Sequence, residues 1–533
     1  MCDQLRADYL SCYGHPSLHT PHIDALAARG VRFAKAYAQA PQCGPSRASF
    51  YTGRYMSSHG SFWNRIPLRP DEKTIGSYLG DLGYTTALVG KSHMKHDQES
   101  FQRLGVDASH PSAALAIQAG FLPYNRDDGL NPDRIAPPTL AYNQTLKARG
   151  YTSDNPWQEN ANNVVDDEGN VYNGWLIQHA DLPANVREED SETAYMTDKA
   201  MEFIEEYEGQ GPWCLHLSYI KPHWPYVAPA PYHELYGEDD IQAVQRSEEE
   251  LASAHPVFRE LAALRDCQVM AREETRQKVI PAYMGLVKQI DDHIGRLTHY
   301  LEEKGLLETT VIVFTSDHGD YLGDHFLSEK LLFHDPSVRI PLIVCDPSPE
   351  ADGSRGTVSD ALVEAIDLLP SLIDLAGGDS GAHGHRLEGH SLLPLLHQQQ
   401  EQLRDYAVAE IDYAGRQIWE TLGIELSECR AYMLCDARWK YVFFEAFDAP
   451  QLFDMDDDPH ELNDLGRSNL PEHQAVIARM REALFQWLRR RKTRVTVSDD
   501  WIKQKTGAAF EQSLGLYIGY FDEEDLVKGQ QSL

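Results

Sequence analysis

The stretch TVIVFTSDHG at residues 310–319 begins as an apolar run and ends abruptly in an aspartate and a histidine. Two other stretches share this pattern: TTALVGKSH at 85–93 and WCLHLSYIKPH at 213–223. Short, nearly continuous apolar runs are typical of strands buried on both faces of a mainly parallel sheet. Ligands bind beyond the carboxyl ends of such strands. The polar residues expected at that edge are Lys91, His93, Lys221, His223, Asp317 and His318.

Helical patterns separate these strands, which indicates an α/β fold. Apolar residues with helical spacing occur at 22–29, 74–82, 193–208 and 276–306. The sequence therefore predicts a large, mainly parallel sheet sandwiched by helices in residues 1–385. Two segments, 95–190 and 229–275, are expected to be insertions. The first is rich in Asn, Asp and Pro, and we expect it to be irregular and to lie over the site, because long loops in compact domains are usually functional.

The pattern changes after residue 385, where strands are expected to follow one another directly. These strands are expected at 407–411, 431–435, 439–444 and 451–455, and a helix at 471–491. Strands joined by tight turns pair antiparallel, so residues 386–491 are predicted to form a smaller α+β domain with an antiparallel sheet. The tail at 492–533 contains no motif with recognisable chemistry, and we expect it to be an arm in a homo-oligomer.

The composition excludes several classes of protein. The 533 residues include 82 acidic and 48 basic side chains, a formal net charge of −34, which disfavours binding to nucleic acid or to anionic membranes. An anionic substrate would then need a locally positive pocket. No apolar stretch is long enough to span a membrane, and the first residues lack the features of a signal peptide. The eight cysteines form no C-x-x-C pair, so reduced thiols and a cytoplasmic location are expected.

The stretch CGPSR at 43–47 places a thiol at the start of a predicted helix. Pro45 suits the first helical turn, where its missing N–H costs nothing, and Gly53 can end the helix. Backbone N–H groups and the positive end of the helix dipole converge at Cys43, which makes an anion site. Arg47 lies one turn further along and can reach the same place. A buried free cysteine alone is usually inert, so the context has to decide its role.

These five residues match the C-x-P-S-R core of the type I sulfatase signature, and GYTTALVGKSH at 83–93 matches a second signature. The chain thus resembles the formylglycine-dependent sulfatases of the alkaline phosphatase superfamily, close to the branch that includes phosphonate monoester hydrolases. The resemblance covers nearly the whole chain and implies an alkaline phosphatase-like sheet. Further matching stretches are DQLRAD at 3–8, KPHWP at 221–225, LGDH at 322–325 and DPHE at 458–461.

The resemblance implies that Cys43 is oxidised to formylglycine (3-oxoalanine) by a formylglycine-generating enzyme. The hydrated aldehyde is a geminal diol, and one of its hydroxyls attacks the sulfur of a small anionic ester. The alcohol leaves, and a covalent sulfo-enzyme intermediate remains. Loss of the proton from the second hydroxyl then expels sulfate and regenerates the aldehyde. Covalent catalysis of this kind divides one difficult step into two.

The resemblance also implies one divalent metal ion. Its expected ligands are Asp3, Asp317, His318 and the oxygen of modified Cys43, and Gln4 is expected to add a fifth. Family members often have aspartate at position 4 and asparagine at position 318, so the identity of the metal stays open. Hard oxygen ligands favour Ca²⁺, and the single imidazole also suits Mn²⁺.

Other polar residues are expected to bind the substrate or to move protons. The cations implied for the transferred group are Arg47, Lys91 and Lys330. His223 is the expected general acid for the leaving alcohol, because imidazole titrates near neutral pH. His93 is expected to bind the second diol hydroxyl during breakdown of the intermediate. Asn64 is expected to bind substrate.

The choice of substrate depends on Lys91 and His93. Phosphonate monoester hydrolases have neutral hydroxyl residues at the matching positions, so this chain is expected to prefer sulfate esters. Hydrolysis of phosphonate monoesters or phosphodiesters with the same nucleophile is the alternative. Two further alternatives are a non-catalytic oxyanion-binding protein with unconverted Cys43 and a metal-dependent phosphatase that uses the thiol.

The beginning of the sequence also departs from the family pattern. Relatives have a buried strand before the metal-binding aspartate, whereas only Met1 and Cys2 precede Asp3 here. We expect that an extension upstream of Met1 would complete this strand and improve solubility and activity.

Overall fold

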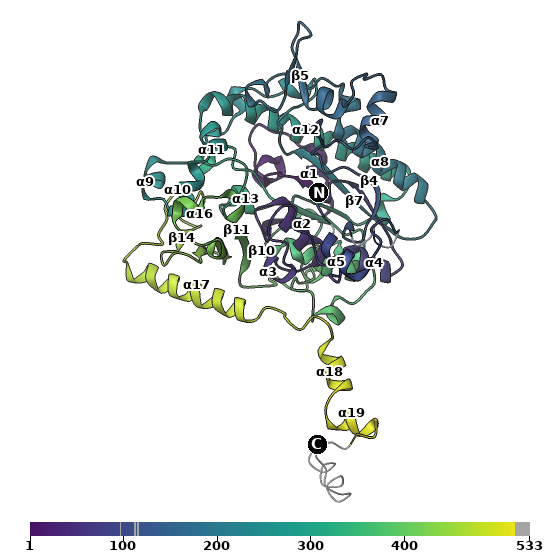
Figure 1. Ribbon diagram of the computed structural model, residues 1–533, viewed down its shortest axis with the longest axis vertical. Coiled ribbons are helices and arrows are strands. Elements are labelled where there is room, and N and C mark those ends of the chain that lie inside the picture. The colour runs from purple at the N-terminus through teal and green to yellow at the C-terminus, as the bar shows by residue number, and fades with distance from the viewer. Residues whose placement is uncertain (96, 111–112, 114–116, 517–533) are drawn as a thin grey trace, which may run out of the picture.

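The computed structural model describes residues 1–95, 97–110, 113 and 117–516 (Figure 1). Its largest sheet has two four-stranded parts, in the orders β1-β7-β3-β4 and β10-β2-β9-β8. A parallel bridge between Cys2 and Ser316 joins them, so that β1 lies beside the end of β8. The strands are β1 (Cys2–Asp3), β2 (Val31–Tyr37), β3 (Thr85–Gly90), β4 (Leu122–Arg126), β7 (Trp213–Pro222), β8 (Ile312–Thr315), β9 (Leu342–Cys345) and β10 (Thr357–Glu364).

The predicted mainly parallel sheet is confirmed. Strands β1, β7, β3 and β4 are parallel to one another, and β10 is parallel to β2. Only β9 of this sheet runs antiparallel to both of its neighbours, β2 and β8, among the residues described. The apolar runs at 85–93, 213–223 and 310–319 form β3, β7 and β8, and their carboxyl ends lie at the same edge.

Helices cover both faces of this sheet, as predicted. Leu88 and Val89 are consecutive residues of β3 that point to opposite faces, and they belong to different hydrophobic cores. The core around Val89 contains α1 (Pro21–Arg29), α8 (Glu192–Tyr207) and α12 (Glu273–Glu303). The core around Leu88 contains α2 (Cys43–Thr52), α4 (Ile75–Asp81) and α14 (Leu368–Leu375).

The segment 95–190 is more regular than expected. Its β4 pairs with β3 and extends the large sheet, and β5 (Asn163–Val165) and β6 (Val171–Asn173) form a hairpin. It also contains α5 (Gln98–Leu104) and α7 (Ala141–Ala148). The sequence LPYNR of β4 has no apolar run, because none of its residues is fully buried. Residues 96, 111–112 and 114–116 of this segment lie outside the described residues. The segment 229–275 contains the helices α9 (Glu248–Ser253), α10 (Pro256–Ala262) and α11 (Arg265–Met270).

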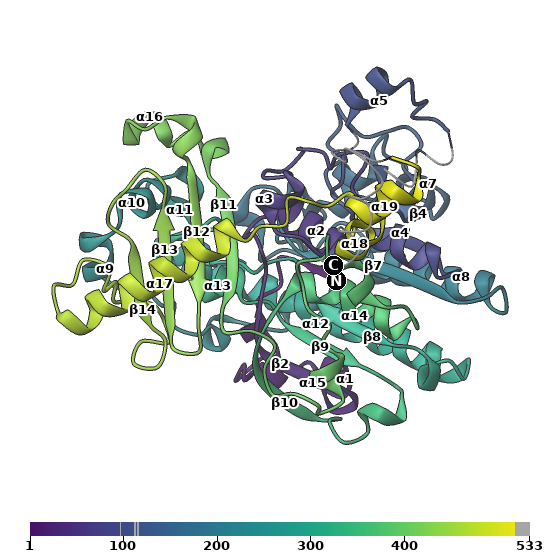
Figure 2. The same cartoon turned by 90° about the horizontal axis from the view of Figure 1, so that it is seen from below.

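The smaller antiparallel sheet is also confirmed. Its strands follow the chain order β11 (Ala407–Asp412), β12 (Arg430–Cys435), β13 (Trp439–Phe444) and β14 (Gln451–Asp454). Helix α17 (Pro471–Arg489) lies along this sheet and buries Ile477, Met480 and Leu484 against it (Figure 2). The domain boundary near residue 385 stays a prediction.

Four short helices complete the described α-helices of the body. They are α3 (Met56–His59), α13 (Asp335–Val338), α15 (Leu393–Leu396) and α16 (Trp419–Leu422).

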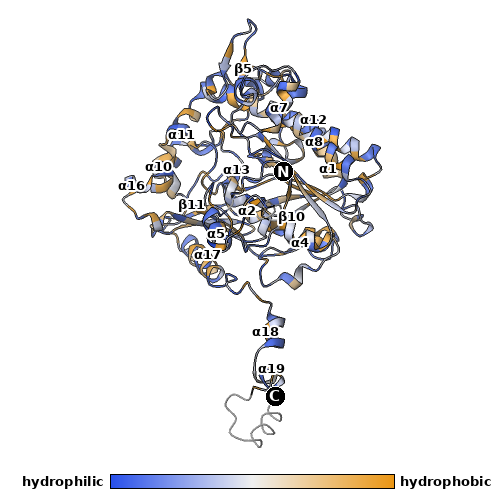
Figure 3. Ribbon diagram, turned by 45° about the vertical axis from the view of Figure 1, so that its right-hand side comes forward, coloured by the Kyte–Doolittle hydropathy of each residue, from blue (hydrophilic) through white to orange (hydrophobic). Residues whose placement is uncertain are grey.

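Beyond α17 the chain leaves the body of the molecule. Helices α18 (Asp499–Lys505) and α19 (Ala508–Ser513) form an extended arm (Figures 1 and 3). Residues 517–533 of the predicted tail lie outside the described residues. Across the described ranges, no helix is both long enough and apolar enough to cross a membrane. All eight cysteines are free thiols.

The large sheet is open at its centre. Strand β1 has two residues, whereas β7 beside it begins at Trp213. A pocket of about 430 Å³, partly open to solvent, is lined by residues of both β7 and β8, including Leu215, Leu217 and Val313. The amino group of Met1 donates a hydrogen bond to the Leu217 carbonyl at 2.9 Å. The two parts of the sheet are therefore joined mainly at the edge where the polar residues gather.

Candidate active site

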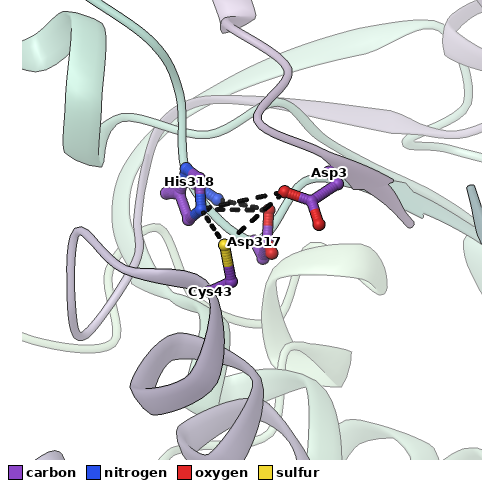
Figure 4. A group of neighbouring side chains, drawn as sticks. All are labelled: Asp3, Cys43, Asp317 and His318. Carbon is purple, nitrogen blue, oxygen red and sulfur yellow. Dashed lines mark hydrogen bonds and ion pairs between the residues drawn. The ribbon is translucent and has the colours of Figure 1, made fainter. Parts of the chain in front are cut away.

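Four side chains from three segments meet at the carboxyl edge of the sheet (Figure 4). Asp3 ends β1, Cys43 begins α2, and Asp317 and His318 follow β8. Cys43 Sγ lies 3.1 Å from His318 Nε2 and 3.7 Å from Asp3 Oδ1. All four side chains are buried. The structure thus brings together four of the five residues that were predicted to bind a metal, and their role as ligands stays a prediction.

Helix α2 is tied to this cluster at its first turn. The Ser46 hydroxyl donates to the Asp317 carbonyl at 2.6 Å, and the Gly44 N–H donates to Asn64 Oδ1 at 2.8 Å. A Cβ on Gly44 would lie 2.9 Å from that oxygen, so glycine permits the close approach. Gly53 has a φ of 64° and ends the helix as predicted. Asn64 therefore fixes the backbone next to Cys43.

Arg47 holds the two carboxylates of the cluster. Its Nε donates to Asp317 Oδ2 at 2.8 Å, and one terminal nitrogen donates to Asp3 Oδ2 at 3.3 Å. The other terminal nitrogen donates to the Lys91 carbonyl and to Ser218 Oγ, each at 2.8 Å. The guanidinium is completely buried. Its contacts are with the protein groups that surround Cys43, so it orients them.

The cluster has the chemistry of a divalent-cation site. His318 Nδ1–H donates to the Gly319 carbonyl at 2.9 Å, which leaves the Nε2 lone pair facing Cys43 and the carboxylates. The available donor atoms of the four residues lie within 4.8 Å of one another. Two carboxylates and one imidazole suit Ca²⁺ or Mn²⁺. The residues present therefore fit such an ion.

Buried cations make the surroundings of Cys43 positive, as an anionic substrate requires. Lys91 Nζ forms an ion pair with Asp3, and Lys330 Nζ lies 3.2 Å from His223 Nε2. Burial alone would raise the pKa of the Cys43 thiol, but Lys330 and Lys91 outweigh burial and hold that pKa well below its usual value. The local potential is therefore positive inside a strongly acidic protein.

His223 lies beside this group in a defined tautomer. Its Nδ1 is 2.7 Å from the Trp224 carbonyl, which can only accept, so the Nδ1 carries the hydrogen. Nε2 is then the atom that can gain or lose a proton at the site. Burial lowers the pKa of His223, and the positive charge of Lys330 lowers it further.

A buried network beside the cluster was not predicted. Gln4 Nε2 donates to Asp320 Oδ2 at 2.5 Å, and the Tyr226 hydroxyl donates to the same oxygen at 2.7 Å. The amide oxygen of Gln4 accepts from Lys330 Nζ at 2.5 Å. Gln4 as a fifth metal ligand stays a prediction. Asp320 follows directly on Asp317-His318-Gly319, and this position in the motif was the available signal.

His93 is the predicted site residue that the structure leaves apart from these contacts. Among the described residues its imidazole has no hydrogen-bond partner, and its Nδ1 is buried. Its backbone has a φ of 58°, in the left-handed region that residues other than glycine rarely adopt. The turn from Lys91 to His93 is nevertheless next to the cluster, because Lys91 itself reaches Asp3.

Comparisons with known proteins agree with this geometry. The family model described as Sulfatase matches residues 1–378, and the model described as N-sulphoglucosamine sulphohydrolase, C-terminal, matches residues 323–490. The chain is 29% identical over 512 residues to the multifunctional alkaline phosphatase superfamily protein PehA of Trinickia caryophylli, covering 91% of this chain and 93% of that protein. It is 26% identical to an arylsulfatase of Clostridium perfringens, with coverage of 94% and 96%.

A solved structure supports the same relationship. The phosphonate monoester hydrolase of Silicibacter pomeroyi superimposes with a TM-score of 0.80 at 29% identity, over 94% of this chain and 97% of that one. The alkaline phosphatase-like arrangement predicted from the sequence is confirmed by this similarity. One family model covers well over half of the chain. The chain therefore belongs to the sulfatase family of sulfuric ester hydrolases.

Proposed function

We propose that the protein hydrolyses small sulfate esters with a formylglycine that a formylglycine-generating enzyme makes from Cys43. The observation that carries the proposal is the position of Cys43 at a helix start, between two carboxylates and two buried lysines. Sγ of the encoded cysteine stands where the oxygens of the hydrated aldehyde would lie. The sulfatase family membership supports the same reaction.

The proposed metal ligands are Asp3, Asp317, His318 and the side-chain oxygen of residue 43, with Gln4 as a fifth ligand. Ca²⁺ is the proposed ion and Mn²⁺ is the alternative. Such an ion would make a neighbouring hydroxyl more acidic and would withdraw charge from the ester oxygens. Arg47 keeps both carboxylates in place through the hydrogen bonds described above.

The remaining residues would bind the substrate and move protons. Lys91 and Lys330 hold the sulfate oxygens, where positive charge stabilises the transition state. A diol hydroxyl would lose its proton to solvent as its oxygen bonds to sulfur, the bond from sulfur to the alcohol oxygen would break, and the alcohol would take a proton from His223 Nε2. His93 then takes the proton of the second hydroxyl, and cleavage of the C–O bond frees sulfate from the sulfo-enzyme intermediate. Asn64 is proposed to contact the substrate from beside α2.

Hydrolysis of phosphonate monoesters or phosphodiesters is the second candidate. It is supported by the similarity to a phosphonate monoester hydrolase over almost the whole chain. Lys91 and His93 favour sulfate, because the resemblance places neutral hydroxyl residues there in phosphonate monoester hydrolases.

Two measurements test the proposal. The tryptic peptide 36–47, from protein made in its native host, is expected to show an aldehyde in place of the Cys43 thiol by mass spectrometry. A steady-state comparison of an aryl sulfate with phenyl phosphonate is expected to give the larger kcat/KM for the sulfate. Cys43→Ala is the control for background hydrolysis. An unmodified thiol in folded, metal-loaded protein would remove the nucleophile and leave an oxyanion-binding protein or a thiol enzyme.

The organisation of the whole chain is proposed as follows. Residues 1–385 form the catalytic unit, 386–491 the C-terminal unit, and 492–533 an arm that contacts a second copy of the chain. The support for the arm is the extension of residues 492–516 away from the body (Figure 3) and the exposure of Trp501, Leu514 and Leu516.

A further inference from the structure

The turn that follows β3 is held from outside by residues at the end of β4. Asp128 Oδ1 accepts hydrogen bonds from the backbone N–H groups of Ser92, at 3.1 Å, and His93, at 3.0 Å. Its other oxygen pairs with an Arg126 terminal nitrogen at 2.6 Å. That nitrogen also donates to the Met94 carbonyl at 2.7 Å. One carboxylate and one guanidinium thus bind three consecutive residues of the turn.

The turn is also held on its inner side. The Lys91 N–H donates to the Ser218 carbonyl at 3.0 Å, and the Lys91 carbonyl accepts from Arg47 at 2.8 Å. Gly90 allows this approach, because a Cβ there would lie 2.0 Å from the Ser218 oxygen. Lys91 is therefore bound at its own backbone, and the residues after it depend on Asp128.

His93 needs such an external partner. Its φ of 58° lies in a sparsely populated region that is strained for a residue other than glycine. A conformation of this kind persists only when the surroundings impose it. The carboxylate of Asp128 does so, because two N–H groups converge on one charged acceptor. Burial disfavours the ionised carboxylate of Asp128, but the positive charge of Arg126 favours it more strongly. The pKa of Asp128 therefore lies below its ordinary value.

We propose that Asp128, supported by Arg126, is a positioning residue that aims His93, and with it the end of the Lys91 turn, at the substrate. This inference rests on the proposed function of the turn. The role needs the acceptor atom more than the charge, because the two N–H bonds define the backbone. Displacement of a catalytic group by about 1 Å can lower the rate about 100-fold.

Three variants test the proposal with an aryl sulfate. Asp128→Ala is expected to lower kcat at least tenfold with a smaller change in KM, because the turn can leave its left-handed conformation. Asp128→Asn retains the oxygen that accepts from Ser92 and His93 but loses the acceptor that faces Arg126, so it is expected to recover part of kcat. Asp166→Ala is the matched control. Asp166 likewise accepts a backbone N–H, from Asn170 at 2.8 Å, but it lies in the β5–β6 hairpin and is expected to leave kcat unchanged.

A double-mutant cycle and hydrogen exchange separate positioning from general damage. In a His93→Ala background, Asp128→Ala is expected to cause little further loss of kcat. The amides of Ser92 and His93 are expected to exchange faster in Asp128→Ala and at nearly the normal rate in Asp128→Asn. The proposal is overturned by an unchanged kcat in Asp128→Ala, or by an equal loss in both backgrounds. An inactive parent enzyme would count against the proposed function. The exchange rates would still test whether Asp128 holds the backbone of Ser92 and His93.

Discussion

Single residues at the site have contacts that explain their chemical type. Arg47 bonds two carboxylates, a carbonyl and a hydroxyl at once, which the planar fork of a guanidinium can do and a lysine cannot. Local motifs were sufficient to predict that Cys43, Asp317 and His318 lie together, because each belongs to a short contiguous motif. Asp320 was missed although it directly follows the motif at 317–319. Tyr226 escaped prediction because its bond to Asp320 joins residues 94 positions apart, for which no local pattern exists.

Lys91 gives a prediction at this scale. Lys91→Met is expected to lower kcat/KM for an aryl sulfate about 100-fold, because a buried cation beside the reacting group is lost. The ratio of sulfate to phosphonate activity is expected to fall as well. Steady-state kinetics on protein with confirmed aldehyde content measure both effects. Lys35→Met is the control, since the amino group of this half-buried lysine donates to the Ala437 carbonyl, outside the site. An unchanged sulfate-to-phosphonate ratio would contradict the role of Lys91 in specificity.

At the scale of elements, prediction succeeded where burial leaves a pattern in the sequence. Strands β3, β7 and β8 follow apolar runs because both of their faces are covered. Strand β4 has partly exposed residues, and β2 (VRFAKAY) includes half-buried Arg32 and Lys35, so neither shows such a run. The left-handed turn at His93 could not be predicted from the sequence either, because it is held by a hydrogen bond to Asp128, which follows β4. The strands of the small sheet were predicted because short turns connect them.

Strand β11 gives a prediction for stability. Glu410 is completely buried on this strand, and its carboxylate accepts from the Ser57 N–H at 2.9 Å. Burial raises the pKa of Glu410 from 4.5 to about 7. The folded protein therefore holds a proton that the unfolded chain has released between those values. Stability from this group is complete below pH 4.5 and falls by about 3 kcal/mol as the pH rises to 7.

Glu410→Gln is expected to remove this loss. Denaturant unfolding at pH 5 and pH 8 should show the variant gaining stability over the parent at pH 8, and little difference at pH 5. The exposed residue Glu401 provides the control variant, Glu401→Gln. A parallel loss of stability in parent and Glu410→Gln would exclude this carboxyl as the source.

At the scale of the whole molecule, the net charge bears on how substrate reaches the site, and the shape bears on assembly. A net charge of −34 surrounds a site that is positive, so long-range attraction cannot bring anionic esters to it, and local cations must bind them. The arm formed by α18 and α19 extends away from the body of the molecule. Helices of six and seven residues are marginal in water without packing partners.

The arm gives a prediction for assembly. A chain ending at residue 494 is expected to have the mass of a monomer by light scattering, whereas the full chain is expected to have the mass of a homo-oligomer. Trp501→Asp is expected to weaken assembly without shortening the chain, because its exposed indole is the largest apolar group of the arm. Identical masses for all three proteins would reject a role of the arm in assembly.

The pocket between β7 and β8 has a mechanical consequence. Strands β7 and β8 are not hydrogen-bonded neighbours, so they can separate along this pocket without breaking a ladder of hydrogen bonds between them. The sheet halves meet through β1, and β1 contains Asp3, so separation would displace a carboxylate of the site. We expect low concentrations of denaturant to abolish activity reversibly before far-ultraviolet circular dichroism or fluorescence reports unfolding. Leu215→Phe, which enlarges a side chain lining the pocket, should move this loss to higher denaturant concentration.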